Sequence, residues 1–193
     1  MIQLYMASTT NSQRASVGLS EAGLPYEVHR LDLRAKEQKS PEHLARNPYG
    51  KVPVIVDPDG PGGKPVTVFE SGAILLYAAE KSGKLYGQDA ADRVDVQKWF
   101  MLHMNGSLPY LGALKKYGAL GPECERVVSV IDNHLANSKF FAAAFSIADI
   151  CFFPRVAEFD ESVFPISRYK NIVRWIEEVR SRPGVAEGMS QPK

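Results

Sequence analysis

Residues 1 to about 82 alternate between short apolar strands and amphipathic helices, and this order leaves few folds open to the chain. The strands are β-branched and aromatic runs such as IQLYM at Ile2–Met6 and VTVF at Val66–Phe69. The helices repeat apolar residues at helical spacing. The predicted order is β-α-β followed by β-β-α, with strands at 2–6, 26–31, 54–56 and 66–69 and helices from about 12 to 22 and 71 to 81.

Two connections determine how these elements are joined. The β-α-β half requires a parallel strand pair with a right-handed crossover. The two later strands flank the turn-rich segment DPDGPGGKP, which favours an antiparallel hairpin. Thioredoxin-like domains use this order, so residues 1–82 are predicted to form such a domain.

The pattern changes to helices alone after about Tyr86. The fold class is therefore α/β plus all-α, with an all-helical domain at 88–193 and a linker at SGKLYGQ between the two domains. Ser146 and Asp149 in FSIADI have the spacing of a capping box, which is a folding signal. Predicted helices cover 91 to about 117 with a bend at Pro109, 123–137, 147 to about 159 and 169–182.

Charge and composition exclude several classes of partner. With 23 basic against 22 acidic residues, the net charge of +1 offers no electrostatic footprint for nucleic acid. No apolar run approaches the roughly 20 residues of a membrane span, so a cytoplasmic location is expected. Cys124 and Cys151 have no metal-ligand spacing with the histidines, and no metal site is predicted.

An acid and a hydroxyl stand side by side where a strand meets a helix, in FESGAILLY at 69–77. Ser71 is predicted to be the N-cap, where unpaired backbone N–H groups and the helix dipole attract a carboxylate. Glu70 beside it can accept an ammonium group. The pair therefore suits the head group of a free α-amino acid, although simple capping by Ser71 with Glu70 as a surface acid accounts for the same residues.

The loop Ala7–Ser12 leads from the first strand into a helix N-terminus. An anion placed there gains hydrogen bonds from Thr9 or Asn11 and from the helix end, which lowers the pKa of a thiol. The loop contains no cysteine, so the sulfur must arrive with a ligand. A capping loop rich in Ser, Thr and Asn is the alternative.

The segment NPYGKVPVIVD at 47–57 places Val52-Pro53 directly before a strand. A proline there marks a sheet edge or adopts the cis form, and the exposed backbone of Val52 can pair with an extended peptide. Lys51 can contact a second carboxylate, or it is a solvated surface lysine. A small peptide with an amino-acid head and a central thiol fits all three segments, and glutathione is such a peptide.

The same motifs, with FSIADI in the helical half, resemble the glutathione transferase superfamily across nearly the whole chain. The start LYMASTTNSQR, followed by GLPYEVHRLDL and Gln38, is similar to the nu class and to the related yeast nitrogen-regulator prion domain. Those proteins typically show Thr-Pro-Asn where this chain has Thr9-Thr10-Asn11. The resemblance implies a glutathione-dependent disulfide-bond reductase with weak transferase activity.

The resemblance also implies a role for individual residues. Thr9 and Asn11 are expected at the glutathione sulfur, with Tyr5 as a rival partner. The remaining ligand contacts are expected from Gln38 at the glycyl end, Lys51 at a carboxylate, Val52 on the cysteinyl backbone, and Glu70 with Ser71 on the γ-glutamyl head.

The expected enzyme uses ionised glutathione to attack a disulfide or an electrophilic carbon. The alternative is a non-catalytic glutathione-binding or protein-interaction module, because this fold does not determine function. The resemblance further implies a homodimer. A pocket for the second, small-molecule substrate is expected from residues of the first long helix, namely Met101, Met104, Leu108, Tyr110 and Leu111.

Overall fold

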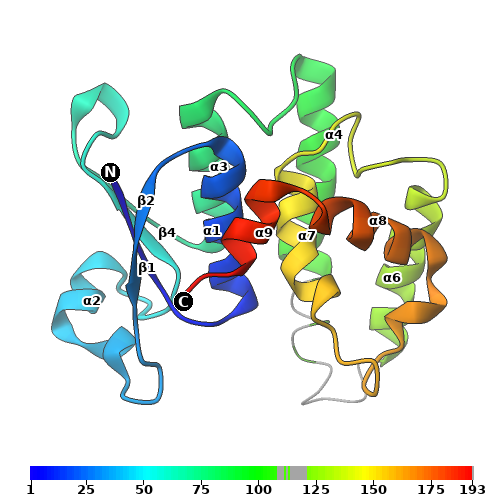
Figure 1. The fold of residues 1–193 in the computed structure, drawn as a ribbon, viewed down its shortest axis with the longest axis horizontal. Helices are drawn as coiled ribbons and strands as arrows, with labels where there is room; N and C mark the ends of the chain where they lie inside the picture. Colours follow the sequence, from blue (N-terminus) through cyan, green and yellow to red (C-terminus); the bar gives the residue numbers. More distant parts are fainter. Residues whose placement is uncertain (108–110, 112, 114–120, 193) are drawn as a thin grey trace. The chain divides into compact units, whose positions relative to one another are not determined.

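The computed structural model describes residues 1–107, 111, 113 and 121–192. It divides into two compact units, one of Met1–Gly83 with Pro183–Lys193 and the other of Lys84–Arg182. Figure 1 shows the elements of each unit. Pro183–Lys193 belongs to the predicted range 88–193 of the helical domain, whereas in the structure this stretch packs with the first unit.

A four-stranded sheet forms the centre of the first unit, with strand order β2-β1-β3-β4. β1 pairs in parallel with β2, and β3 pairs antiparallel with both β1 and β4. This topology confirms the predicted thioredoxin-like domain. The strands are β1 at Ile2–Met6, β2 at Tyr26–Arg30, β3 at Val54–Asp57 and β4 at Val66–Phe69.

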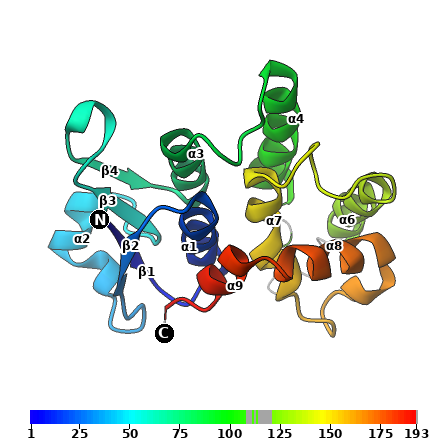
Figure 2. The same ribbon diagram turned by 45° about the horizontal axis from the view of Figure 1, so that its top comes forward.

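Helices cover both faces of this sheet (Figures 1 and 2). Helices α1 (Thr10–Ala22) and α3 (Ser71–Ser82) lie on one face and pack closely, because Gly18 leaves room for the side chain of Leu75. The short helix α2 (Pro41–Arg46) lies on the other face. α3 ends at Gly83 with a φ of 68°, as its position after the last apolar repeat predicts.

Alternation along β1 separates the two faces. Leu4 and Met6 are fully buried, whereas Gln3 and Tyr5 are only half-buried. Since successive side chains of a strand point to opposite faces, Tyr5 points away from Leu4 and Met6. On its own face it meets α2, where the Arg46 guanidinium lies 4.2 Å from the centre of the Tyr5 ring.

The segment between β2 and β3, for which no element was predicted, contains helix α2 and a 3₁₀ turn, η1 (Glu37–Lys39). The Ser40 hydroxyl accepts a hydrogen bond from the His43 N–H at 3.2 Å, and Pro41 occupies the first helical position. Serine at the N-cap followed by proline is a favourable helix start. A second 3₁₀ turn, η2 (Pro61–Gly63), lies between β3 and β4.

Helix α9 (Pro183–Met189) lies beyond the last predicted helix and packs on α1. The Ser16 hydroxyl donates to the Gly188 carbonyl at 2.7 Å, and the Val185 N–H donates to Glu21 Oε1 at 3.1 Å. A Cβ at Gly188 would collide with the backbone of Val17. The close approach of the two helices therefore requires glycine at position 188.

In the described part of the second unit, every regular element is a helix. Its predicted first helix appears as α4 (Ala90–Met101) followed by a π-helical segment, η3 (Leu102–Ser107). The predicted bend at Pro109 and the pocket residues Leu108 and Tyr110 lie outside the described residues. The later elements are α6 at Gly121–Leu135, α7 at Ile147–Ala157, η5 at Ile166–Arg168 and α8 at Lys170–Arg180.

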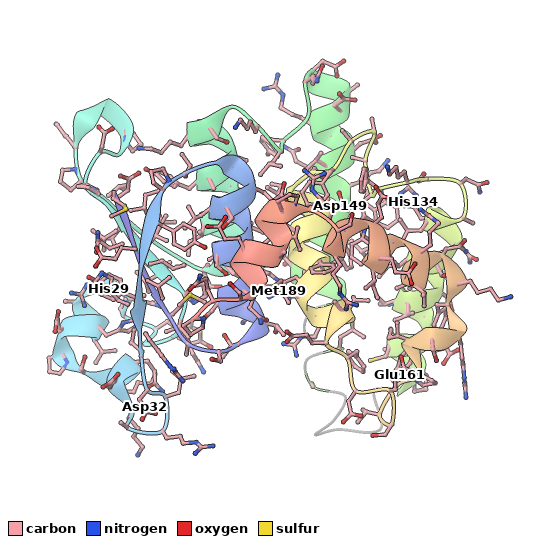
Figure 3. All side chains as sticks on the ribbon, in the orientation of Figure 1. His29, Asp32, His134, Asp149, Glu161 and Met189 are labelled. Atoms are coloured by element: carbon pink, nitrogen blue, oxygen red, sulfur yellow. The ribbon has the colours of Figure 1, made fainter. Side chains whose placement is uncertain are left out.

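The predicted capping box at the start of α7 is present. The Ala148 N–H donates to Ser146 Oγ at 3.2 Å, and the Ser146 N–H donates to Asp149 Oδ2 at 3.0 Å. Asp149, labelled in Figure 3, also accepts from the Trp175 indole N–H at 2.9 Å and from the Phe141 N–H at 3.2 Å. Burial raises the pKa of this carboxyl to about 6, although the hydrogen bonds from Trp175, Phe141 and Ser146 oppose the rise.

None of the helices within the described ranges has the length and apolar character needed to cross a membrane.

Candidate functional site

One cavity in the first unit brings together most of the residues singled out in the sequence. It measures about 290 Å³ and opens between the start of α1, the segment before β3 and the start of α3. Five of the seven predicted site residues line it, whereas Thr9 and Gln38 do not. The lining consists of Asn11, Asn47, Tyr49, Lys51, Val52, Pro53, Glu70 and Ser71.

Glu70 and Ser71 occupy the helix start one position away from the prediction. Glu70 is the N-cap of α3, and Ser71 is the first helical residue. Glu70 has a φ of 72° and a ψ of 124°, which is a strained conformation for a residue with a Cβ. Its carboxylate is exposed and makes no capping hydrogen bond, so it remains available to a ligand ammonium group beside the cavity.

The Val52-Pro53 peptide bond is cis, which is one of the two alternatives that the sequence left open. The carbonyl before it is anchored, because Lys51 O accepts from His43 Nε2 at 2.8 Å and from Asn47 Nδ2 at 3.0 Å. No backbone–backbone hydrogen bond is found for the Val52 N–H or C=O within the described ranges. These groups can therefore pair with an extended peptide in the cavity.

Two lining residues, Asn47 and Tyr49, were not predicted. Asn47 is buried, and its Oδ1 accepts from the Tyr49 N–H at 3.0 Å. This hydrogen bond fixes the turn that holds Tyr49 at the cavity. The Asn-Pro pair at 47–48 is a turn signal that indicates this conformation.

Asn11 enters the cavity from the first turn of α1, and its orientation is set by a neighbour. Arg14, one turn later, is fully buried and donates from Nη1 to Asn11 Oδ1. The α1 N-terminus also contributes backbone N–H groups and partial positive charge at this end of the cavity. Arg14 was not predicted as a site residue, and its three-residue spacing from Asn11 on a helix is the signal that could have revealed it.

Thr9 serves as the N-cap of α1. Its Oγ1 accepts from the Ser12 N–H at 3.2 Å and donates to Ser12 Oγ at 3.0 Å. Ser12 Oγ accepts in turn from the Ala7 N–H at 3.4 Å. The single hydroxyl proton of Thr9 is therefore already engaged within the loop, as in the capping alternative considered for this segment.

Gln38 and Lys51 lie on the side of the cavity formed before β3. The Lys51 side chain is exposed, and its Nζ stands 5.6 Å from the centre of the Tyr49 ring. Gln38 belongs to η1, and its backbone carbonyl lies close to Gly50. This oxygen would be only 3.0 Å from the Cβ of any other residue at position 50. Gln38 Oε1 is buried without a hydrogen-bond partner in the described part of the chain. Gln38 thus neighbours the cavity without lining it.

The cysteines do not belong to this cavity. Cys124 and Cys151 are both buried as free thiols, and neither lines the cavity. Burial, together with the charge of Glu123, raises the pKa of Cys124. Within residues 1–107, 111, 113 and 121–192, no group of His, Cys, Asp and Glu residues could hold a metal ion.

A separate polar cluster joins β3 to α3 at the far end of β3. The buried Asp57 accepts from the Tyr77 hydroxyl at 2.5 Å and pairs with Lys81 Nζ at 2.8 Å. Burial by itself raises the pKa of Asp57, but the hydrogen bonds from Lys81 and Tyr77 outweigh it and keep that pKa below its usual value. Asp57 is not among the residues that line the candidate site.

Comparison with known proteins identifies the family. Residues 2–80 match the family model for the glutathione S-transferase N-terminal domain, and residues 99–183 match the model for the C-terminal domain. The chain therefore belongs to the glutathione S-transferase family, which confirms the predicted resemblance.

The relatives that match include disulfide-bond oxidoreductases. Disulfide-bond oxidoreductase YfcG of Escherichia coli is 33% identical over 203 residues, which span 98% of this chain and 94% of that protein. A glutathione transferase of Pseudomonas putida, solved with one glutathione disulfide bound per subunit, is 36% identical with a TM-score of 0.95. That alignment covers 100% of this chain and 92% of the solved chain.

A third relative is a glutathione transferase of Burkholderia graminis, solved with two glutathione molecules per subunit. It is 36% identical with a TM-score of 0.93, and the alignment covers 100% of this chain and 88% of the solved chain.

Proposed function

We propose that this chain is a glutathione-dependent enzyme that ionises the glutathione thiol in the cavity and uses it to reduce disulfides. The observation that carries the proposal is the cavity itself. It combines an acid at Glu70, a helix start at Ser71, a free peptide edge at Val52 and an amide at Asn11. A tripeptide with an amino-acid head and a central thiol has a partner for each of its parts.

The γ-glutamyl head binds at the start of α3. Its ammonium group pairs with the Glu70 carboxylate, and its carboxylate binds the Ser71 hydroxyl and the N–H groups of the first turn. The cysteinyl backbone pairs with the Val52 N–H and C=O, as an added strand would. Lys51 binds the glycyl carboxylate, and Gln38 supports that end from η1.

Asn11 is the group that we assign to the sulfur. Thr9 is less suitable, because its hydroxyl proton is engaged by Ser12. Tyr5 is also unsuitable, because it lies on the α2 face against Arg46 and does not line the cavity. An amide N–H beside the helix N-terminus stabilises a thiolate more than a thiol, so it lowers the thiol pKa without a general base.

The reaction proceeds by two exchanges at sulfur. The bound thiolate attacks one sulfur of a disulfide, a new S–S bond forms, and the other sulfur leaves as a thiolate and takes up a proton. A second glutathione then attacks the glutathione sulfur of the mixed disulfide and releases the other substrate thiol. Two glutathione molecules supply the two electrons and end as glutathione disulfide.

One observation favours disulfide reduction over conjugation as the main activity. YfcG, which matches over nearly the whole chain, is a disulfide-bond oxidoreductase. The lining contains no cysteine, so in either reaction the attacking sulfur must come from glutathione. Conjugation to an electrophilic carbon uses the same thiolate and is proposed as the weaker activity.

Three measurements on the purified protein test this function. Ultraviolet thiolate absorbance gives the pKa of bound glutathione, which should lie well below that of free glutathione. Turnover of hydroxyethyl disulfide should exceed that of a chloronitrobenzene. Retention on glutathione resin, with neither a lowered pKa nor turnover, would show instead a non-catalytic glutathione-binding module.

We also propose that the chain acts as a homodimer, in keeping with its family resemblance. Large apolar side chains are exposed on both units, including Tyr49 and Phe69 in the first and Val94 and Met101 in the second. Such side chains gain stability when a partner covers them. Light scattering during size-exclusion chromatography measures the mass, and a monomer at micromolar concentration would contradict the proposal.

A further inference from the structure

We propose that Arg14 is a positioning residue for the thiolate, acting through the side-chain amide of Asn11. This inference rests on the proposed function. Arg14 does not line the cavity, and its side chain is fully buried in α1. Its guanidinium donates from Nη1 to Asn11 Oδ1, and Asn11 lines the cavity.

The chemistry of the two groups determines the orientation of the amide. An asparagine side chain carries one acceptor oxygen and one donor nitrogen, and it can present either end to a neighbour. A guanidinium has donors only and stays protonated in proteins, so it can pair only with the oxygen end of the amide. The Asn11 oxygen must therefore face Arg14, and its NH₂ group is left to donate to a ligand.

This orientation matters because a thiolate needs a donor. If the amide turned over, its oxygen would face the sulfur, and a lone pair would repel the negative charge. The amide would then raise the thiol pKa instead of lowering it. Arg14 removes this wrong orientation before any ligand binds, which is the kind of preorganisation that makes an electrostatic site effective.

The charge of Arg14 adds a second effect through the same contact. A hydrogen bond from a charged donor polarises the amide that accepts it, and this strengthens the N–H groups at the other end of the amide. The burial of Arg14 keeps solvent from screening its charge. Both effects pass through Asn11, so the influence of Arg14 on the sulfur should depend on the presence of the Asn11 side chain.

A double-mutant cycle on the pKa of bound glutathione tests this dependence. The variants are Arg14→Met, Arg14→Lys, Asn11→Ala and Asn11→Ala with Arg14→Met. Arg180→Met, at an exposed arginine of α8, is the matched control for loss of a positive charge. Binding of S-methylglutathione, which has no thiol proton, verifies that each variant still forms the cavity.

Arg14→Met should raise the thiol pKa by about one unit, which corresponds to the weakening of one hydrogen bond to a charged group. Arg14→Lys should keep the pKa within a few tenths of a unit, since an ammonium is also a donor-only cation. The KM for glutathione should change less than kcat. In the Asn11→Ala background, Arg14→Met should cause no further shift.

Different outcomes contradict the role of Arg14 and the proposed function. A wild-type protein that does not lower the thiol pKa contradicts the proposed function. A wild-type protein that lowers it, with the same pKa in Arg14→Met, overturns the inference alone. A shift of equal size in the Asn11→Ala background also overturns it, because Arg14 would then act on the sulfur directly. If Arg14→Met does not fold, Arg14→Gln replaces it, because a neutral amide can present either a donor or an acceptor to Asn11 and no longer fixes its orientation. The thiol pKa should then rise as in Arg14→Met, and an unchanged pKa would overturn the inference.

Discussion

The ring of Tyr5 stacks on the imidazole of His29, with their centroids 4.7 Å apart and their planes inclined by 17°. His29, labelled in Figure 3, lies on β2 directly opposite Tyr5 in the parallel ladder. The Arg46 guanidinium approaches the Tyr5 ring as well. Tyr5 therefore belongs to the packing between the sheet and α2.

Removal of the Tyr5 hydroxyl should leave the chemistry intact. Tyr5→Phe keeps the ring that stacks on His29, so we expect the thiol pKa of bound glutathione and kcat/KM to stay within twofold of wild type. The pKa titration and the hydroxyethyl disulfide assay measure both quantities. A large rise in the thiol pKa in Tyr5→Phe would return Tyr5 to the role of sulfur partner.

Substitution of Thr9 should affect mainly stability, whereas substitution of Asn11 should affect mainly catalysis. Thr9→Val removes the N-cap of α1 and should lower the free energy of unfolding by about 1 kcal/mol, with a small effect on the thiol pKa. Asn11→Ala should raise that pKa and reduce kcat at neutral pH by about tenfold, because one donor to the thiolate is lost. Denaturant unfolding measures the loss of stability, and the pH dependence of kcat reports the change in the thiol pKa. The reverse pattern would assign the sulfur to Thr9.

Glu70→Gln should weaken glutathione binding. The substitution keeps the shape of the side chain but removes the charge that pairs with the ligand ammonium, so we expect the dissociation constant to rise roughly tenfold or more. Glu80→Gln, at an exposed glutamate of the same helix, is the matched control. Isothermal titration with glutathione gives both constants. Equal affinities for the two variants would contradict the pairing of Glu70 with the ligand ammonium group.

Glycine at position 70 should improve stability while it removes binding. Glu70 holds a φ of 72°, which costs of order 1–3 kcal/mol for a residue with a Cβ but little for glycine. Glu70→Gly should therefore unfold at a higher denaturant concentration than Glu70→Gln, with no measurable glutathione binding. A lower midpoint for Glu70→Gly would mean that the backbone at position 70 is not strained.

Asp149 should make the stability of the second unit depend on pH. Its folded pKa of about 6 lies above the ordinary value of 3.8, so the folded protein holds this proton more tightly than the unfolded chain does. The resulting stabilisation is complete below about pH 4 and is lost as the pH rises through 6. At about 1.4 kcal/mol per pKa unit, the loss approaches 3 kcal/mol.

Asp149→Asn isolates this contribution, since asparagine does not titrate and its oxygen can still accept from Trp175. We expect the difference in unfolding free energy between wild type and variant to fall between pH 4 and 6 and to stay constant above. Urea unfolding followed by circular dichroism at several pH values measures it. A flat difference for Asp149→Asn would contradict the raised pKa.

Local signals in the sequence were sufficient for most of the fold. The succession of strands and helices along the first unit follows from alternation and turn residues, whereas the pairing of β1 with β3 was not predicted. The Ser146–Asp149 box appears as predicted, because a capping motif satisfies its own hydrogen bonds within a few residues. Helix α2 has a similar local signal at Ser40-Pro41, which is easily overlooked in a short polar segment. Helix α9 also begins at a proline, Pro183, but nothing local in the sequence shows that it packs on the distant α1.

The candidate site shows where local reasoning stops. The sequence indicates both Glu70 and Ser71, but it predicts Ser71 as the N-cap, whereas in the structure Glu70 is the N-cap and Ser71 is the first helical residue. Capping preferences favour serine at the N-cap, and the structure instead holds a strained glutamate there. The engagement of Thr9 by Ser12 and of Asn11 by Arg14 depends on side-chain directions within one helical turn. Residue types alone do not reveal which of two neighbouring polar groups keeps a free donor.

The packing of α9 has a consequence for the order in which the molecule is built. Ser16 and Gly188 are 172 positions apart in the chain, so their contact can form only after the whole of the second unit has been synthesised. The first unit therefore emerges early but completes its core late. A nascent chain stalled before Pro183 should expose the α9-facing side of α1 to chaperones, even though every strand of the sheet is already present.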